Sequence, residues 1–431
     1  MTGLVVRSER SLVRAKSGSH RHLVVKVNAP KLAGTAARRP MNLAFVLDRS
    51  GSMAHGKLDF AKGAALEGIG RLQQSDRFAV VVYDQEIDVT TPSTLATETS
   101  KREATRALNE VHARGSTDLC SGWLTGCRQI AARLDETHVA RALLFTDGQA
   151  NHGETGHEAL AQHAAELRAR GIVTSTFGIG LDFDERLLRT IADAGGGNAR
   201  FIESNADFAR LLREELSDTM DVVHRGLILH IQTPHGPLGE AIGVEVVGPW
   251  PVTKREGGFD VALGDLVSEE QLEFVLRIML PPGAVGTTAE LQFSLSERDG
   301  AVESPAASAG WTWETHDAND RQPRDVAVDR LVAARHADRA REAAVLANRG
   351  RDYGAAKRLL IRVADRIGGY AGHDSILREI EATLRADAVK YSTIMDGRSQ
   401  KEAYYQSTSS LRGRTASGSA TRHPRHEEPG E

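Results

Sequence analysis

The feature that most constrains this chain is an alternation of short apolar segments with amphipathic ones between residues 41 and 222. Residues 42–47 (NLAFVL) are continuously apolar, which is typical of a strand buried on both faces. Residues 57–73 place apolar side chains three or four positions apart, which indicates a helix. The alternation continues with strands predicted at 76–83, 86–90, 141–145, 173–178 and 199–202 and helices predicted at 101–111, 119–134, 158–170, 185–194 and 207–219. The short connections predict right-handed βαβ units around a doubly wound, mostly parallel sheet.

The pattern changes after residue 223, where apolar residues recur at every second position. Residues 272–280 carry Leu, Phe, Leu, Ile and Leu at alternate positions, and turns rich in Pro and Gly separate the neighbouring segments. This pattern predicts an antiparallel β-sandwich over residues 224–316. Two strand-like runs in residues 1–39 also need a sheet, so we expect them to join the sandwich. The α/β domain, residues 40–223, is then an insertion into it.

The C-terminal part of the chain is predicted to be helical and then disordered. Three amphipathic segments at 324–348, 352–367 and 375–388 are separated by Gly-containing breaks, which predicts a helical hairpin or cap over residues 324–392. Residues 397–431 are rich in Ser, Thr, Arg and Gly and are predicted to form a disordered tail. The predicted fold class is therefore α/β, with an antiparallel sandwich and a C-terminal helical region.

Composition limits the classes of function. The chain has 54 Lys and Arg against 58 Asp and Glu, a formal net charge of −4, so general nucleic-acid binding is not expected. Its two cysteines, Cys120 and Cys127, exclude a disulfide framework. No stretch approaches the roughly 18 apolar residues of a membrane span. A cytoplasmic protein without a membrane span is therefore expected.

Oxygen-bearing side chains follow the predicted strands at one edge of the parallel sheet. Asp48 comes directly after the first buried strand, and Ser50 and Ser52 follow it at alternate positions. Asp147 follows the strand at 141–145, and Thr117 precedes the helix at 119–134. Because ligand sites of open parallel sheets lie at the carboxyl ends of the strands, these five side chains are expected to meet there.

A set of two carboxylates and three hydroxyls suits a hard divalent cation and disfavours zinc. Mg²⁺ is the expected ion, with Mn²⁺ or Ca²⁺ as possible substitutes. The two carboxylates leave the site near neutral, and five donors leave room for another ligand on an ion that takes about six. The residues therefore predict a metal site that accepts an acidic side chain from another molecule.

The motifs DRSGS at 48–52, GST at 115–117 and TDG at 146–148 resemble the metal-ion-dependent adhesion site (MIDAS) of von Willebrand factor type A (VWA) domains. The resemblance implies that Asp48, Ser50, Ser52, Thr117 and Asp147 hold the metal, and that a ligand carboxylate completes its shell. It also implies a protein-interaction module. The wider layout, with LGDL at 263–266, is similar to bacterial calcium-activated chloride channel homologues and to inter-α-trypsin inhibitor heavy chains.

The sequence thus predicts a non-enzymatic module that binds an Asp or Glu of a partner protein through Mg²⁺, with further surface contacts around Arg49, His55 and the loop at Gly115. Two alternatives remain open. One is a Mg²⁺-dependent hydrolase that uses the same ion to activate water. The other is a structural assembly subunit that binds through the sandwich or the helical cap. No catalytic residue is assigned.

Overall fold

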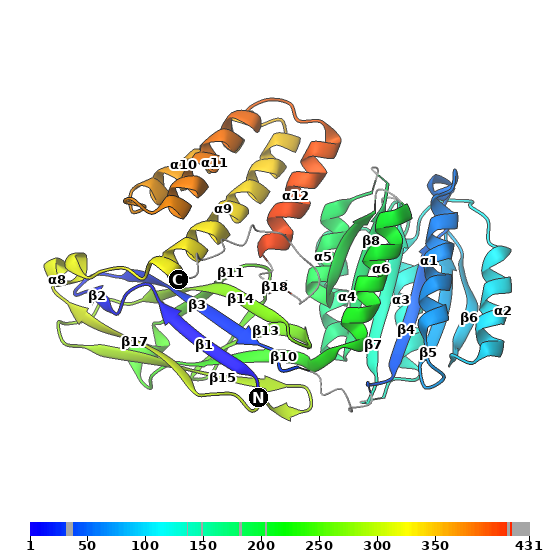
Figure 1. Ribbon diagram of the computed structural model, residues 1–431, viewed down its shortest axis with the longest axis horizontal. Coiled ribbons are helices and arrows are strands. Elements are labelled where there is room, and N and C mark those ends of the chain that lie inside the picture. Colours follow the sequence, from blue (N-terminus) through cyan, green and yellow to red (C-terminus); the bar gives the residue numbers. More distant parts are fainter. Residues whose placement is uncertain are drawn as a thin grey trace, which may run out of the picture. The chain divides into compact units, whose positions relative to one another are not determined.

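The computed structural model describes residues 1–31, 38–135, 137–147, 150–180, 183–202, 205–411 and 414–415. The chain divides into two compact units. One contains Met1–Lys31 together with Val223–Glu431, and the other is the intervening Leu32–Val222. The second unit is thus inserted into the first, and the predicted fold class is confirmed (Figure 1).

The inserted unit is built on a six-stranded sheet with the order β6-β5-β4-β7-β8-β9. Its neighbouring strands pair in parallel, except for the antiparallel pair β5 and β6. All eight residues of β4 are buried, in agreement with its continuous apolar sequence. The bounds are β4 (Met41–Asp48), β5 (Arg77–Tyr83), β6 (Ile87–Leu95), β7 (Val139–Thr146), β8 (Ile172–Ile179) and β9 (Gly196–Ile202).

Helices cover both faces of this sheet (Figure 1). Buried side chains of α1, α2 and α6 share one core with Leu43 and Phe45 of β4. The opposite face carries α3 and α5, whose groups contact Thr174 and Thr176 of β8, and α4 lies beside α5. The bounds are α1 (Lys57–Arg71), α2 (Glu98–Asn109), α3 (Leu119–Ala131), α4 (His157–Ala169), α5 (Glu185–Gly195) and α6 (Asn205–Met220), with a short 3-10 helix at Gly51–Met53.

Two glycines of helix α3 face the sheet, where there is no room for a side chain. A Cβ atom at Gly122 would stand 2.4 Å from the ring of Tyr83, and one at Gly126 would stand 2.3 Å from Val46. The helix begins after Asp118, whose carboxylate accepts a hydrogen bond from the Ser121 amide at 3.0 Å. This packing fixes the loop before α3 against the ends of β4 and β5.

The other unit contains two mostly antiparallel sheets around a shared apolar core that includes Trp311, Trp313 and Phe274. One sheet has the order β1-β3-β14-β11, and the second has the order β12-β13-β10-β15-β17-β2. Strand β2, which the sequence analysis missed, pairs in parallel with β17. The bounds are β1 (Gly3–Ser8), β2 (Leu12–Arg14), β3 (Ser19–Asn28), β10 (Val222–Gln232), β11 (Gly243–Val247), β12 (Val252–Arg255), β13 (Gly258–Val267), β14 (Gln271–Leu280), β15 (Thr288–Glu297), β16 (Gly300–Ala301), β17 (Ala307–Glu314) and β18 (Arg414–Thr415).

Helices complete this unit. Val328 and Val332 of α9 pack on valines of β3, β11 and β14, which seats the helix on one sheet of the sandwich. The bounds are α7 (Pro237–Glu240), α8 (His316–Arg321), α9 (Val326–Arg349), α10 (Tyr353–Gly368), α11 (Ser375–Lys390) and α12 (Gly397–Leu411).

The predicted disorder from residue 397 is wrong for residues 397–411, which form α12. Tyr404 of this helix is buried in the helical core, and the Arg349 guanidinium lies over its ring, 5.4 Å from the centroid. These contacts stabilise a segment whose composition alone is typical of disorder. Residues 412–413 and 416–431 of the predicted tail lie outside the described residues.

Candidate metal-binding site

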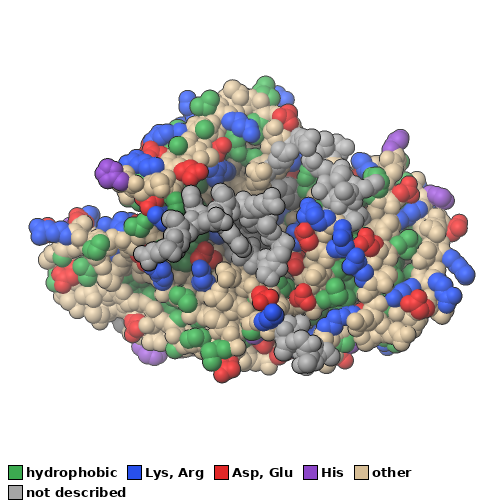
Figure 2. Space-filling model, in the orientation of Figure 1, with side chains coloured by type: hydrophobic (Ala, Val, Ile, Leu, Met, Phe, Trp, Pro, Cys, Tyr) green, Lys and Arg blue, Asp and Glu red, His purple; other side chains and the backbone are tan. Residues whose placement is uncertain are grey.

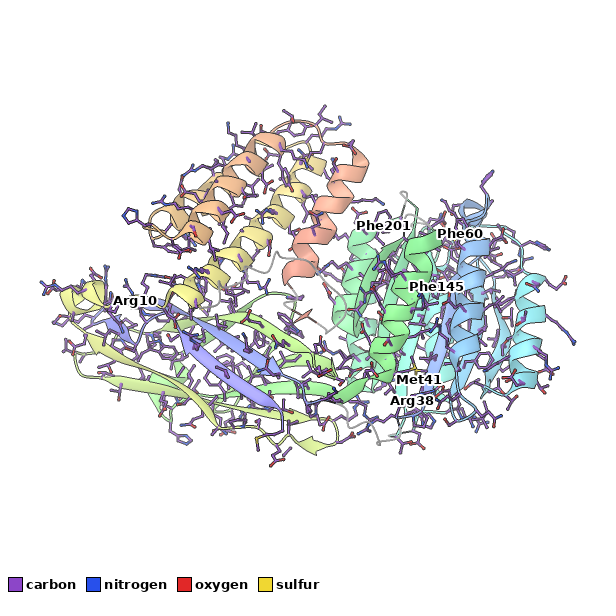
Figure 3. The ribbon with its side chains drawn as sticks, in the orientation of Figure 1. Arg10, Arg38, Met41, Phe60, Phe145 and Phe201 are labelled. Atoms are coloured by element: carbon purple, nitrogen blue, oxygen red, sulfur yellow. The ribbon has the colours of Figure 1, made fainter. Side chains whose placement is uncertain are left out.

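The two carboxylates of the predicted site lie at the ends of the two central strands of the inserted sheet. Asp48 is the last residue of β4, and Asp147 directly follows β7. Leu47 of β4 pairs with Phe145 of β7, so the two strands end at about the same position along the sheet. Figure 3 shows Phe60 of α1 near this edge of the sheet and Met41, at the start of β4, near the opposite edge.

Four of the five predicted residues are joined by hydrogen bonds. The Ser50 amide donates to Asp48 Oδ1 at 2.7 Å. The Ser50 and Ser52 hydroxyl oxygens lie 3.1 Å apart, and the Ser52 hydroxyl donates to Asp147 Oδ1 at 2.7 Å. The loop after β4 therefore turns its two hydroxyls toward the carboxylate that follows β7.

The fifth residue, Thr117, is held in place through its backbone. The Gly51 amide donates to the Gly115 carbonyl at 3.0 Å, which ties the loop of Thr117 to the loop of the two serines. On the other side, the Thr117 amide donates to Asn151 Oδ1 at 2.9 Å and its carbonyl accepts from the His152 amide at 3.1 Å. The backbone thus connects all three loops that carry the predicted ligands.

Burial dominates the electrostatics of Asp48. It raises the pKa of this carboxyl group from its usual value to about 6, although hydrogen bonds from Ser50 and from the Thr146 hydroxyl, at 2.6 Å from Oδ2, act in the opposite direction. The nearby charge of Asp147 raises the pKa further. Burial and the charge of Asp48 also hold the pKa of the Tyr83 hydroxyl well above its usual value. The edge of the sheet therefore concentrates negative charge in a place where water does not screen it.

The donor set fits a hard divalent cation. No group of three His, Cys, Asp or Glu side chains that could hold a metal ion occurs in the described ranges, so a site here must use hydroxyl oxygens as well. The hydroxyl oxygens of Ser50 and Ser52 and the carboxylate of Asp147 form a hydrogen-bonded chain beside Asp48. In addition, the ammonium group of Lys57 pairs with Asp147 Oδ2, so a positive charge already stands at this carboxylate. Asp48, Ser50, Ser52, Thr117 and Asp147 remain the predicted ligands.

Comparison with known families agrees with the geometry. Residues 42–217 match the von Willebrand factor type A domain. The inserted unit is a VWA domain. Domains of this kind are typically adhesion or protein-binding modules.

Curated relatives are distant. The uncharacterized protein sll0103 of Synechocystis is 26% identical over 63% of this chain and 65% of its own length. The uncharacterized protein YfbK of Escherichia coli is 27% identical over 44% of this chain and 33% of its own length. Human inter-alpha-trypsin inhibitor heavy chain H4 is 26% identical over 41% of this chain and 20% of its own length. The chain thus matches less than two thirds of each of these relatives.

Solved structures extend the likeness beyond the VWA domain. A von Willebrand factor type A protein from Catenulispora acidiphila superposes with a TM-score of 0.71 at 22% identity, covering 94% of this chain and 96% of that one. The ArnB paralog VWA2 from Sulfolobus acidocaldarius gives a TM-score of 0.59 at 14% identity, covering 94% and 98%. At these identities the likeness establishes the fold, including the sandwich and the helices that accompany the VWA domain.

Three residues around the VWA site were missed in the sequence. Thr146 contacts Asp48, Tyr83 stands opposite Asp48 in the sheet register, and Lys57 pairs with Asp147. Of these three, only Lys57 could have been recognised from the sequence. It is the first residue of α1, where the positive end of the helix dipole disfavours a cation, so a lysine there indicates a partner outside the helix.

The side chain of Arg49 does not lie at the surface where contacts were predicted around it. Arg49 is only 7% exposed, and its guanidinium group pairs with Asp84 at 3.2 Å and with Asp88 at 2.5 Å. Arg114 pairs with the same Asp84 at 2.8 Å. Arg49 therefore joins the loop after β4 to the loop after β5 and to strand β6. Of the groups named in that prediction, His55 and Gly115 are exposed.

The surface shows the near balance of basic and acidic residues that the composition indicates. On the face visible in Figure 2, basic and acidic side chains are interspersed. Across the described parts of the chain, no helix combines the length and apolar character needed to cross a bilayer.

Cys120 and Cys127 are both free and buried, and burial raises the pKa of their thiols to about 11 and about 12.

Proposed function

We propose that the VWA domain is a metal-dependent protein-binding module. In this proposal Mg²⁺ is held by Asp48, Ser50, Ser52, Thr117 and Asp147, and a carboxylate of a partner's Asp or Glu is the missing ligand. The observation that supports it best is the hydrogen-bonded row from Asp48 through Ser50 and Ser52 to Asp147, formed by two loops at one edge of the sheet.

The chain's own groups have distinct tasks in this proposal. Asp48 and Asp147 balance the double positive charge, and their burial makes the site selective for a cation over a neutral molecule. The hydroxyls of Ser50, Ser52 and Thr117 contribute neutral donors, so the ion keeps enough charge to attract another carboxylate. Bound Mg²⁺ supplies the Lewis acidity that captures this carboxylate.

We propose binding without catalysis. Both carboxylates of the site already accept hydrogen bonds, from Ser50 and Thr146 at Asp48 and from Ser52 at Asp147, and the proposal uses both as ligands. Neither is then left to act as a general base. We also propose a cytoplasmic location. Two free, buried cysteines suit the reducing conditions of that compartment.

Metal binding is tested first, by isothermal titration of the EDTA-dialysed full chain with Mg²⁺ and with Mn²⁺. One bound ion per chain is expected. Asp48→Asn is expected to weaken binding by more than about 100-fold, since the loss of outer-shell partners alone costs about 10–100-fold at metal sites. The matched control is Asp59→Asn on α1, whose side chain is 76% exposed. Equal affinities of wild type and Asp48→Asn would contradict the proposal.

The ligand is tested by selecting displayed peptides on the immobilised full chain in Mg²⁺. The selected peptides are expected to share an Asp or Glu, to lose binding when that residue becomes Asn or Gln, and to be released by EDTA. They are also expected not to bind the Asp48→Asn variant. Peptides that bind equally well with EDTA would favour the alternative in which the sandwich or the helices carry the interaction.

A further inference from the structure

The first residue of α1 places a positive charge inside the candidate metal site. The Lys57 ammonium pairs with Asp147 Oδ2, while the other oxygen of the same carboxylate accepts from Ser52. Asp147 is fully buried and the Lys57 side chain is 25% exposed. Lys57 therefore neutralises one of the two carboxylates that the proposed function assigns to the metal.

The position of Lys57 is built into the fold. Gly56, which precedes it, has a φ of 91° and caps α1, so the chain turns sharply before the helix. The Lys57 side chain then passes Gly180, just beyond the end of β8. A Cβ atom at Gly180 would stand 3.3 Å from Lys57 Cε and 3.6 Å from Nζ. The absence of a side chain at Gly180 thus leaves the space through which the ammonium reaches Asp147.

A lysine at this position opposes the helix dipole, since the first turn of a helix favours anions. The ion pair with buried Asp147 offsets that cost, and in a poorly solvated place such a pair is stronger than one on the surface. While Lys57 is paired with Asp147, part of the charge of this carboxylate is already balanced, so a divalent ion is attracted to it less strongly. If a bound ion displaces the ammonium, Lys57 stays tethered to the start of α1 and keeps a positive charge beside the site.

We propose that Lys57 is a tethered cation that competes with the metal for Asp147 and, once displaced, helps to attract the acidic ligand. This inference rests on the proposed metal site and adds a specificity-determining residue to it. Two carboxylates and a divalent ion sum to zero charge, and the ammonium of Lys57 brings a further positive charge close to them. The lysine therefore weakens metal binding and strengthens the binding of a carboxylate to the metal-loaded site.

The test compares the full-length wild type with Lys57→Met, which keeps the length of the side chain and removes its charge. Mn²⁺ affinity, measured by calorimetry on EDTA-dialysed protein, is expected to be about ten-fold tighter in Lys57→Met, because a like charge is removed from a poorly screened place. Acetate is the second probe, titrated into Mn²⁺-saturated protein while water proton relaxation reports its approach to the ion. Acetate binding is expected to weaken several-fold in the same variant.

Two further variants separate this proposal from a structural role. Lys57→Arg, which keeps the charge, is expected to keep Mn²⁺ affinity nearer to wild type than Lys57→Met does. Lys62→Met, on the same helix and paired with Asp59 at 3.7 Å, is expected to change neither affinity. Circular dichroism checks that every variant is folded.

The outcomes are distinct. If Lys57→Met binds Mn²⁺ no more tightly than wild type while Asp48→Asn still weakens binding by more than about 100-fold, the inference is overturned and the proposed function stands. If Lys57→Met weakens both Mn²⁺ and acetate binding, Lys57 is a structural support of the site and the inference is also overturned. If neither wild type nor Lys57→Met binds the ion, both the inference and the proposed metal site fail.

Discussion

Two buried acidic clusters in the VWA domain differ in how their charge is balanced. Glu215 of α6 is fully buried, and it accepts hydrogen bonds from Arg141 at 2.7 Å, from Asn198 at 2.9 Å and from Ser175. Burial alone would raise its pKa, but the charges of Arg141 and Arg200 hold the pKa of this carboxyl below its usual value. The fold itself supplies the cations that this cluster needs.

Asp48 is buried to the same extent, but it accepts hydrogen bonds from the Ser50 amide and the Thr146 hydroxyl, which are both neutral donors. Its pKa rises to about 6 as a result of burial, and the second carboxylate nearby adds to the rise. The negative charge of Glu215 is balanced by arginines of the fold, whereas that of Asp48 is only partly balanced. A buried carboxylate of the second kind is a candidate for binding a cation from outside.

The largest effect is expected when the Glu215 cluster is broken. Glu215→Ala removes the carboxylate that pairs with buried Arg141 and should lower the free energy of unfolding of the VWA domain by about 3–5 kcal/mol. Urea unfolding, with hydrogen exchange in β7 and β8 to report on this unit, measures the change. Glu215→Gln, which keeps the shape but not the charge, should be destabilised by less than Glu215→Ala. Wild-type stability of Glu215→Ala would show that the cluster is not the balanced one described above.

The opposite result is expected at the metal site. Asp48→Asn removes a buried charge with neutral donors, so the metal-free domain should be as stable as wild type or more stable. Mg²⁺ at about 100 times its Kd should add about 2.7 kcal/mol to the unfolding free energy of wild type. At the same Mg²⁺ concentration it should add less than about 0.4 kcal/mol to that of Asp48→Asn, because the Kd of this variant is expected to be more than about 100-fold higher.

Thermal unfolding with Mg²⁺ and with EDTA measures both effects, and the exposed Asp59→Asn variant serves as the reference. Equal Mg²⁺ stabilisation of Asp48→Asn and wild type would remove the distinction between the two clusters.

A smaller, pH-dependent effect is expected at a buried histidine that several cationic groups face. Burial lowers the pKa of His336 on α9 to about 4, and the cationic groups that face it, His22, Arg277, Arg339 and Arg366, act in the same direction. The unfolded chain binds a proton at this residue near pH 6.5, whereas the folded chain does not bind it until about pH 4. The free energy of unfolding should therefore fall as the pH drops through this window, by about 2 kcal/mol at pH 5.

Hydrogen exchange in α9 and β3 between pH 5 and 7 follows this change. His336→Gln should flatten the pH dependence of stability, while His235→Gln, at an exposed position, should leave it as in wild type. An unchanged slope in His336→Gln would show that other groups cause the loss of stability.

Local pattern was enough to predict most of the fold. The apolar run of β4 and the helical spacing of α1 depend on neighbours in the sequence, and both elements lie within a few residues of their predicted bounds. Strand β2 is only three residues long and is stabilised by pairing with β17, some 300 residues away, so local sequence carries almost no signal for it. Helix α12 was missed for a similar reason, because Tyr404 is buried by other helices.

In the candidate site, too, features within one loop could be predicted from the sequence, and contacts between distant residues could not. The spacing of Asp48, Ser50 and Ser52 after a buried strand could be recognised because these residues share one loop. The contact of Lys57 with Asp147 joins the start of one helix to the end of a strand 90 positions later. The pairing of Arg49 with Asp84 and Asp88, which removes Arg49 from the surface, likewise depends on tertiary structure.

The most direct test of the central idea is a crystal structure of the chain grown with Mn²⁺, with the ion located by its anomalous scattering. One strong peak is expected at the carboxyl ends of β4 and β7, within about 2–2.5 Å of oxygens from the loops of Asp48, Thr117 and Asp147. A peak at another place, or an empty site with the Lys57–Asp147 pair intact in saturating Mn²⁺, would contradict it.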